Sequence, residues 1–412
     1  MHLLYVLLIL LVVTRTGSEI AVRLKQPALV GELLGGVLLG ILIVSAPESA
    51  EAIAELDSDQ TFQAVLDLAV FFLMLLAGIE MRPAELARVS GKATPIALVG
   101  MILPLALGFG LGWWWLPASD WKLAQSLFIG VALAITAVPV AVKVLMDFDR
   151  LQSPVGQVVV AAAVIDDVLS LLLLAVLTSI ITADQSVTPG LLLHILLNVA
   201  IFFTVAWVAG RHLLPRVGHL LKKLESEHAD LSLLIIFALS LSVLAEFLGM
   251  HFLIGSFAAG LLFTRNLVGE DTHDALRSQT EAITLGFLAP VFFASIGIHL
   301  DIGAIVEAPF FLVVLLLAAT VGKLAGSALT ARLVGFSNRD SLAIGSAMNA
   351  RGAVEIIIAD IALRAGLFSR PEPTPPAIDY LFSAIVIMAI LTTLSTPLTL
   401  RRALPAQRDD SD

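Results

Sequence analysis

The chain has 412 residues, of which 58% are hydrophobic and 14% charged, and its mean hydropathy is +0.97. Soluble domains average roughly 45–50% apolar and about 25% charged residues, so this composition excludes an ordinary soluble domain, and it excludes a disordered chain as well. The lack of cysteine excludes disulfides and thiolate metal sites, and a net charge of −10 argues against a nucleic-acid partner. The sequence therefore predicts an all-α protein that crosses a membrane several times.

Thirteen apolar segments are separated by breaks rich in charged residues, proline or glycine, and each segment is interpreted as one transmembrane helix. In chain order they cover residues 2–22, 27–45, 61–81, 92–115, 124–147, 153–183, 189–213, 229–248, 251–266, 282–299, 306–334, 340–366 and 378–402. The ninth segment is short for a span.

The distribution of basic residues supports this division of the chain. Eighteen of the 24 Lys and Arg residues fall in alternate loops, whereas the opposite loops hold only Lys122, Arg364 and Arg370. Positively charged loops resist translocation, so the pattern predicts an N-terminus outside the membrane and a C-terminus in the cytoplasm. Residues 403–412 form a short cytoplasmic tail in this interpretation.

A few charged residues lie inside the predicted spans, where burial of a charge is costly and marks a functional position by default. The basic ones are Arg15, Lys323 and Arg351. The acidic ones are Glu32, Asp67, Asp166, Asp167, Glu246, Glu355 and Asp360. The presence of both signs indicates that these side chains pair with one another in an interior lined by protein.

The strongest local pattern is the adjacent pair Asp166-Asp167 in the middle of the sixth segment. Consecutive helix residues point about 100° apart, so the two carboxylates cannot contact one partner in the same way. Two carboxylates crowded in apolar surroundings favour a group that exchanges a proton for a cation. The alternative is that each aspartate forms a fixed ion pair or caps a helix break.

Two predicted spans contain residues that interrupt a helix. The fifth carries Pro139 after Ile135-Thr136, and the twelfth carries Asn349, Arg351 and Gly352. Unwound backbone at membrane depth is tolerated where it is buried in protein or lines a cavity. Pro139 taken alone is also compatible with an ordinary kink.

The two interrupted spans occupy corresponding positions in two six-helix units. Repeat one covers residues 1–183, a linker helix covers 189–213, and repeat two covers 229–402. A single linker helix places the two units in opposite orientations. Interrupted helices at matching positions of inverted repeats indicate the midplane binding site of a transporter.

Five stretches, in order along the chain, resemble the monovalent cation/proton antiporter superfamily, in its Asp-Asp branch of NapA-like and Kef-type sodium/hydrogen exchanger membrane domains. They are Gln26-Pro27-Ala28-Leu29-Val30-Gly31-Glu32, Ala77-Gly78-Ile79-Glu80, Ile135-Thr136-Ala137-Val138-Pro139, Asp166-Asp167 and Met348-Asn349-Ala350-Arg351-Gly352. The resemblance covers nearly the whole of residues 1–402.

This resemblance implies an NhaA-like antiporter fold with two crossed discontinuous helices and a separate dimerisation domain, working as a homodimer in a prokaryotic inner membrane. It implies an antiporter that exchanges Na⁺, Li⁺ or K⁺ for protons by alternating access, without a cofactor. Asp167 would bind the cation or proton, Asp166 would be salt-bridged to Lys323, and Thr136 would line the cation site.

Residue chemistry agrees with these roles. Two titrating groups and one cation allow two protons to be exchanged for one Na⁺, which favours an electrogenic exchange. Hard cations such as Na⁺ and Li⁺ prefer oxygen ligands, which carboxylates, Thr136 and unwound carbonyls supply, although K⁺ is also compatible. Arg351 and Glu355 are four residues apart, so we expect an ion pair that supports the second break together with Asn349 and Gly352.

Other functions fit the sequence less well. A K⁺/H⁺ antiporter or K⁺ efflux protein of Kef type is the first alternative, although no GxGxxG segment indicates a nucleotide-binding regulatory domain. An intramembrane aspartyl protease would carry its two aspartates on different helices. The sequence has no filter-like Gly-Tyr-Gly segment, which disfavours a passive channel. The acidic pair together with a midplane lysine disfavours a sodium-coupled symporter.

Overall fold

The structure, a computed structural model, describes residues 3–24, 26–44, 59–80, 83–136, 145, 150, 153–182, 189–214, 229–301 and 303–403. Every regular element in these ranges is a helix. Eight of the described helices are long and apolar enough to cross a membrane, and four shorter apolar helices accompany them. The predicted all-α membrane class is confirmed, and each of the thirteen predicted segments contains at least one helix. The number of membrane crossings stays a prediction.

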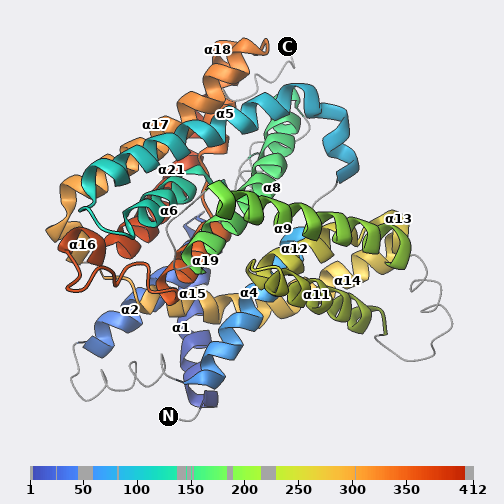
Figure 1. Cartoon of the computed structure of the whole chain (residues 1–412), viewed down its shortest axis with the longest axis horizontal. Helices are drawn as coiled ribbons and strands as arrows, with labels where there is room; N and C mark the ends of the chain where they lie inside the picture. The colour runs from blue at the N-terminus through green and yellow to red at the C-terminus, as the bar shows by residue number, and fades with distance from the viewer. Residues whose placement is uncertain are drawn as a thin grey trace. The chain divides into compact units, whose positions relative to one another are not determined.

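The chain divides into two compact units, each assembled from two stretches that lie far apart in the sequence. Figure 1 labels the helices and colours them by residue number. Unit 1 contains Met1–Pro83 and Thr178–His299, and unit 2 contains Ala84–Leu177 and Leu300–Asp412. Each unit therefore takes a part of both predicted repeats. The repeat boundaries themselves stay a prediction.

Unit 1 is built mostly from apolar helices, two of which pack closely through glycines. Its longer helices are α1 (Leu3–Arg23), α2 (Ala28–Val44), α4 (Gln60–Glu80), α9 (Pro189–Val208), α11 (Ala229–Phe247), α12 (Phe252–Leu262), α14 (Glu270–Ile283) and α15 (Ala289–Ile298). Gly78 of α4 lies directly against Gly260 of α12. A Cβ atom added at Gly260 would stand 2.3 Å from the Leu75 oxygen, so the close approach of these two helices requires glycine there.

One predicted span of unit 1 begins earlier than expected. Hydropathy places its start at residue 282, but the helical backbone runs from Glu270 through α14, a π-helical turn η2 (Thr284–Leu288) and α15. The first part of this helical stretch, α14, is amphipathic and mostly polar, so a search for apolar segments does not detect it. Arg15 of α1 donates to the Leu285 and Gly286 oxygens within the π turn, at 2.5 and 2.8 Å.

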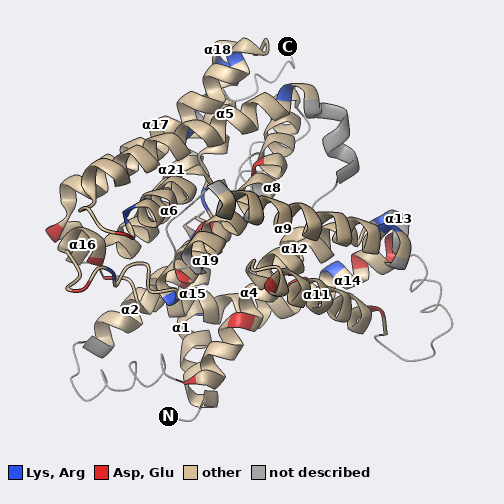
Figure 2. Cartoon of the chain, in the orientation of Figure 1, with Lys and Arg blue, Asp and Glu red and all other residues tan. Residues whose placement is uncertain are grey.

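Unit 2 contains the interrupted helices. Its elements are α5 (Pro83–Trp115), α6 (Lys122–Ala134), α8 (Pro154–Thr182), α16 (Gly303–Glu307), α17 (Pro309–Leu333), α18 (Asn338–Met348), α19 (Ala353–Arg364), α20 (Pro376–Asp379) and α21 (Leu381–Ala403). The predicted twelfth span is the pair α18 and α19, and residues 349–352 between them are not helical. Figure 2 shows long stretches of the described helices without charged residues, so the few charges inside them stand out.

Candidate functional site: the helix breaks of unit 2

The helix α6 ends inside the protein. Ala134 is its last residue, and Ile135 continues in an extended conformation with φ −72° and ψ 146°. The last four carbonyls of any helix lack partners within the helix. Residues 132–136 are fully buried, so water does not reach their carbonyl oxygens and other groups must satisfy them.

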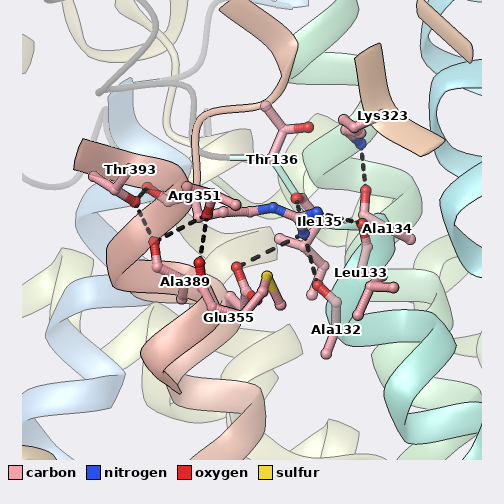
Figure 3. Close-up of polar contacts among 12 residues, drawn as sticks. Ala132, Leu133, Ala134, Ile135, Thr136, Lys323, Arg351, Glu355, Ala389 and Thr393 are labelled. Carbon is pink, nitrogen blue, oxygen red and sulfur yellow. Dashed lines mark hydrogen bonds and ion pairs between the residues drawn. The ribbon is translucent and has the colours of Figure 1, made fainter. Parts of the chain in front are cut away.

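Arg351 supplies most of the missing donors. Its Nη1 atom donates to the Ala132 oxygen at 2.7 Å and to the Ile135 oxygen at 2.8 Å. Its Nη2 atom donates to the Leu133 oxygen at 2.6 Å (Figure 3). The guanidinium positive charge also opposes the negative end of the α6 dipole. One side chain from the second break thus closes the end of the helix that leads into the first.

Lys323 supplies the remaining donor and links α6 to the acidic pair. It lies in α17, and its Nζ atom donates to the Ala134 oxygen (Figure 3). The same Nζ atom lies 2.9 Å from Oδ2 and 3.0 Å from Oδ1 of Asp166 in α8. Both side chains are fully buried. The ammonium group therefore joins three helices, and its charge is balanced by a fully buried carboxylate.

The two breaks are joined directly. The Thr136 hydroxyl donates to the Met348 oxygen at 3.1 Å, and Met348 is the last residue of α18. The Thr393 hydroxyl of α21 donates to the Arg351 oxygen at 3.0 Å. The unwound residues of both breaks are therefore fixed to one another and to α21, as expected for a backbone that leaves the helix in an apolar interior.

The Arg351–Glu355 contact is loose. Nη1 of Arg351 lies 3.7 Å from Oε2 of Glu355, although both side chains are fully buried. Among the described residues, neither Glu355 oxygen has a hydrogen-bond partner, and neither does Oδ1 of the buried Asn349. Gly352, the residue before α19, is extended with φ −167°, which any residue can adopt. The predicted ion pair is thus present as a charge contact without a hydrogen bond.

Two predicted site residues lie wholly or partly outside the description. Pro139 falls outside the described residues. Asp167 belongs to α8 and directly follows Asp166, but its side chain is not among those described. The roles predicted for these residues, and the transport roles of the others, stay predictions.

Tyr380 is another titratable group of unit 2. It follows α20, outside the spanning helices, and its hydroxyl donates to Oε2 of Glu307 at 2.5 Å. This hydrogen bond to Glu307 raises the pKa of Tyr380 to about 12. The phenol is therefore neutral at physiological pH and does not exchange protons there.

Sequence reasoning missed the backbone part of this site. It singled out Arg351 as a partner of Glu355 alone, whereas the stronger contacts of Arg351 are the carbonyls of α6. It also missed Thr393, whose only sequence signal is a cluster of hydroxyl residues in an apolar helix. Such a cluster is usually satisfied within its own helix, and the single hydroxyl hydrogen of Thr393 is shared between the Arg351 oxygen at 3.0 Å and the Ala389 oxygen at 2.7 Å.

The whole chain matches a known family and known proteins. Residues 6–405 match the family model described as "Sodium/hydrogen exchanger, transmembrane". The chain is 30% identical over 400 residues to the Na(+)/H(+)-K(+) antiporter GerN of Bacillus cereus. The aligned region covers 97% of this chain and 95% of GerN. It is 29% identical over 407 residues to a Na(+)/H(+) antiporter of Enterococcus hirae, with 97% of this chain and 98% of that protein covered.

The fold also matches a solved structure. The sodium proton antiporter MjNhaP1 of Methanocaldococcus jannaschii at pH 8 superposes with a TM-score of 0.77, over 98% of this chain and 99% of that one, at 17% identity. This similarity concerns the fold. The family match extends over nearly the whole chain and includes both breaks, so the protein belongs to the sodium/hydrogen exchanger transmembrane family.

Proposed function

We propose that the protein is a secondary active antiporter that exchanges a monovalent cation for protons across the inner membrane of a prokaryote. The observation that carries the proposal is the fully buried Asp166–Lys323 pair at the broken end of α6. A buried ion pair is poor evidence of stability, because removing both charges is often neutral or stabilising. A charged pair at a helix break in a transporter family therefore indicates transport chemistry.

The proposed cycle uses three groups. Asp167 releases its proton and takes the cation, with an oxygen of Thr136 as a further ligand, and Asp166 releases Lys323 when the cation approaches the carboxylates. Lys323 then gives up its proton, because an ammonium group without its counter-ion is unfavourable in a dry interior. One cation is thus exchanged for two protons, which makes the exchange electrogenic. Alternating access carries the loaded site between the two sides of the membrane.

Adjacent carboxylates on one helix argue against protease chemistry, because both aspartates lie on α8. For the cation, oxygen ligands favour Na⁺ or Li⁺. K⁺ is the second candidate, because the name of the relative GerN includes K⁺ exchange. The working unit that we propose is a homodimer with its N-termini outside and its C-termini in the cytoplasm.

The test is transport in liposomes that contain the purified protein and a trapped pH dye. Addition of Na⁺, Li⁺ or K⁺ in turn should move protons, and Asp167→Ala should abolish the movement. Glu246→Gln is the control, because it removes an exposed carboxylate of α11 in unit 1. Undiminished exchange in Asp167→Ala would overturn the site assignment, and no cation-driven proton movement in the wild type would overturn the function.

A further inference from the structure

All donor hydrogens on one nitrogen of Arg351 are used by α6. Nη1 of a guanidinium carries two hydrogens, and in Arg351 they go to the Ala132 and Ile135 oxygens. Nη1 is also the atom nearest to Glu355, at 3.7 Å. It therefore has no hydrogen left for the carboxylate. Arg351 cannot bind α6 fully and donate from Nη1 to Glu355 at the same time.

Glu355 is a buried acceptor without a donor. Its side chain is fully buried, and neither oxygen has a hydrogen-bond partner among the described residues. An ionised carboxylate in such a place is far more costly than a neutral carboxylic acid. The arrangement in this structure therefore suits the neutral form of Glu355.

Two charged side chains among the described residues act on Glu355. The positive charge of Arg351, at the break, and that of Lys323, on α17, both attract the Glu355 carboxylate electrostatically. Asp166, on α8, in turn acts on Arg351. The helices α6 and α21 pack against α19. From α6 carbonyl oxygens, and from α21 the Thr393 hydroxyl, contact Arg351, the partner of Glu355 at the break.

We propose that Glu355 is a positioning residue that offers Arg351 a second binding place, and that ionisation of Glu355 draws Arg351 away from the carbonyls of α6 and opens them to the transported cation. This inference rests on the proposed function. At acidic pH Glu355 is neutral and Arg351 stays on the carbonyls. At alkaline pH the carboxylate attracts the guanidinium, which needs to shorten its 3.7 Å separation to hydrogen-bond distance. The Ala132 and Ile135 oxygens are then free to bind a hard cation.

The test is the pH dependence of the apparent KM for Na⁺ in proteoliposomes. Glutamine has the shape of glutamate but does not ionise, so Glu355→Gln should keep Arg351 on α6 at every pH. We expect its KM at alkaline pH to rise about tenfold over wild type, the effect of one hydrogen bond to a charged group. The KM at acidic pH and the maximal rate should change less than twofold. Glu355→Asp, which still ionises, should restore the pH dependence.

Asp360→Asn is the matched control. It removes a carboxylate from the same helix, but one that already binds Arg364 at 2.8 Å. It should leave the pH dependence of KM unchanged. A wild-type pH dependence in Glu355→Gln would overturn the inference while leaving the antiporter function intact. Loss of exchange in the wild type itself would instead overturn the function.

A structural measurement covers the case in which Glu355→Gln does not fold. Structures of the wild-type protein determined at acidic pH and at alkaline pH with Na⁺ should differ in the position of one side chain. We expect Arg351 on the α6 carbonyls in the first and within hydrogen-bond distance of Glu355 in the second. Arg351 on the carbonyls in both would overturn the inference.

Discussion

The two units use charge in opposite ways. In unit 2, Asp166, Lys323, Arg351 and Glu355 are fully buried, and all four lie at or beside interrupted helices. In the described part of unit 1, the carboxylate most deeply buried is Glu32, with 6% of its surface exposed. The ion pairs among the described residues of unit 1 are mostly exposed, as in Arg277–Glu80 at 3.1 Å.

This difference indicates that unit 1 mainly packs helices together, whereas unit 2 holds the candidate site. Unit 1 brings helices together by direct backbone contact at glycines such as Gly78 and Gly260, which needs no polar groups. Unit 2 gives up helical hydrogen bonds at two breaks and replaces them with charged side chains. Backbone oxygens outside regular helix can serve as ligands of a hard cation, whereas stability alone does not call for them. The following substitutions test this division, beginning with the largest expected effect.

Lys323→Ala should have the largest effect. It leaves Asp166 as a buried charge without its ion-pair partner, which costs about 3–5 kcal/mol of unfolding free energy. We also expect the voltage dependence of exchange to weaken or disappear. Thermal unfolding of the purified protein and transport under an imposed membrane potential measure the two effects. A variant that is stable and fully electrogenic would remove the proposed role of the pair.

Gly260→Ala should come next, and its effect should concern stability alone. The added methyl group meets backbone atoms of α4, including the Leu75 oxygen at 2.3 Å, so the helices must separate. Overpacking of this kind costs about 1–3 kcal/mol. The cation KM of the protein that still folds should match the wild type. A changed pH dependence of KM would show that unit 1 takes part in the chemistry.

Thr136→Val should have a smaller effect on stability and a clear effect on transport. It removes the hydrogen bond to the Met348 oxygen that joins the two breaks, at a cost of about 1 kcal/mol. Because Thr136 is a proposed cation ligand, we expect a higher KM for Na⁺ than in Thr136→Ser, which keeps the hydroxyl. Equal KM values in the two variants would exclude the hydroxyl as a ligand.

Arg277→Ala should have the smallest effect. Arg277 and Glu80 are 43% and 34% exposed, and exposed ion pairs contribute about 0.2–1 kcal/mol. The change in melting temperature should fall further when the salt concentration is raised, because ions screen the pair. A loss as large as that of Lys323→Ala would contradict the division between the two units.

Sequence predicted much of the fold because long apolar segments determine membrane helices almost by themselves. The start of α14 escaped because its residues are polar and its helix is amphipathic. The second break was predicted from Asn349, Arg351 and Gly352, and the structure interrupts the helix at residues 349–352. The charged residues of the site stood out because charges are rare inside spans.

What sequence could not reveal is which atoms those charges contact. Arg351 and Glu355 are neighbours by helical spacing, but the hydrogen bonds of Arg351 go to residues more than 200 positions earlier in the chain. Carbonyl oxygens have no signature in a sequence, since every residue carries one. The lack of a donor for Glu355 likewise depends on how α19 packs in three dimensions.

The closed end of α6 has a consequence for leakage. A pathway lined by bare carbonyl oxygens would let cations pass down their gradient without any return of protons. Here the four oxygens of residues 132–135 are held by cations that are tied to the protein, Arg351 and Lys323. If the transported ion binds these oxygens, as proposed above, it must displace a charge that cannot diffuse away, so we expect passage without exchange to be disfavoured. The same two side chains complete the end of α6, and under the proposed function we expect them also to keep an idle transporter closed to ions.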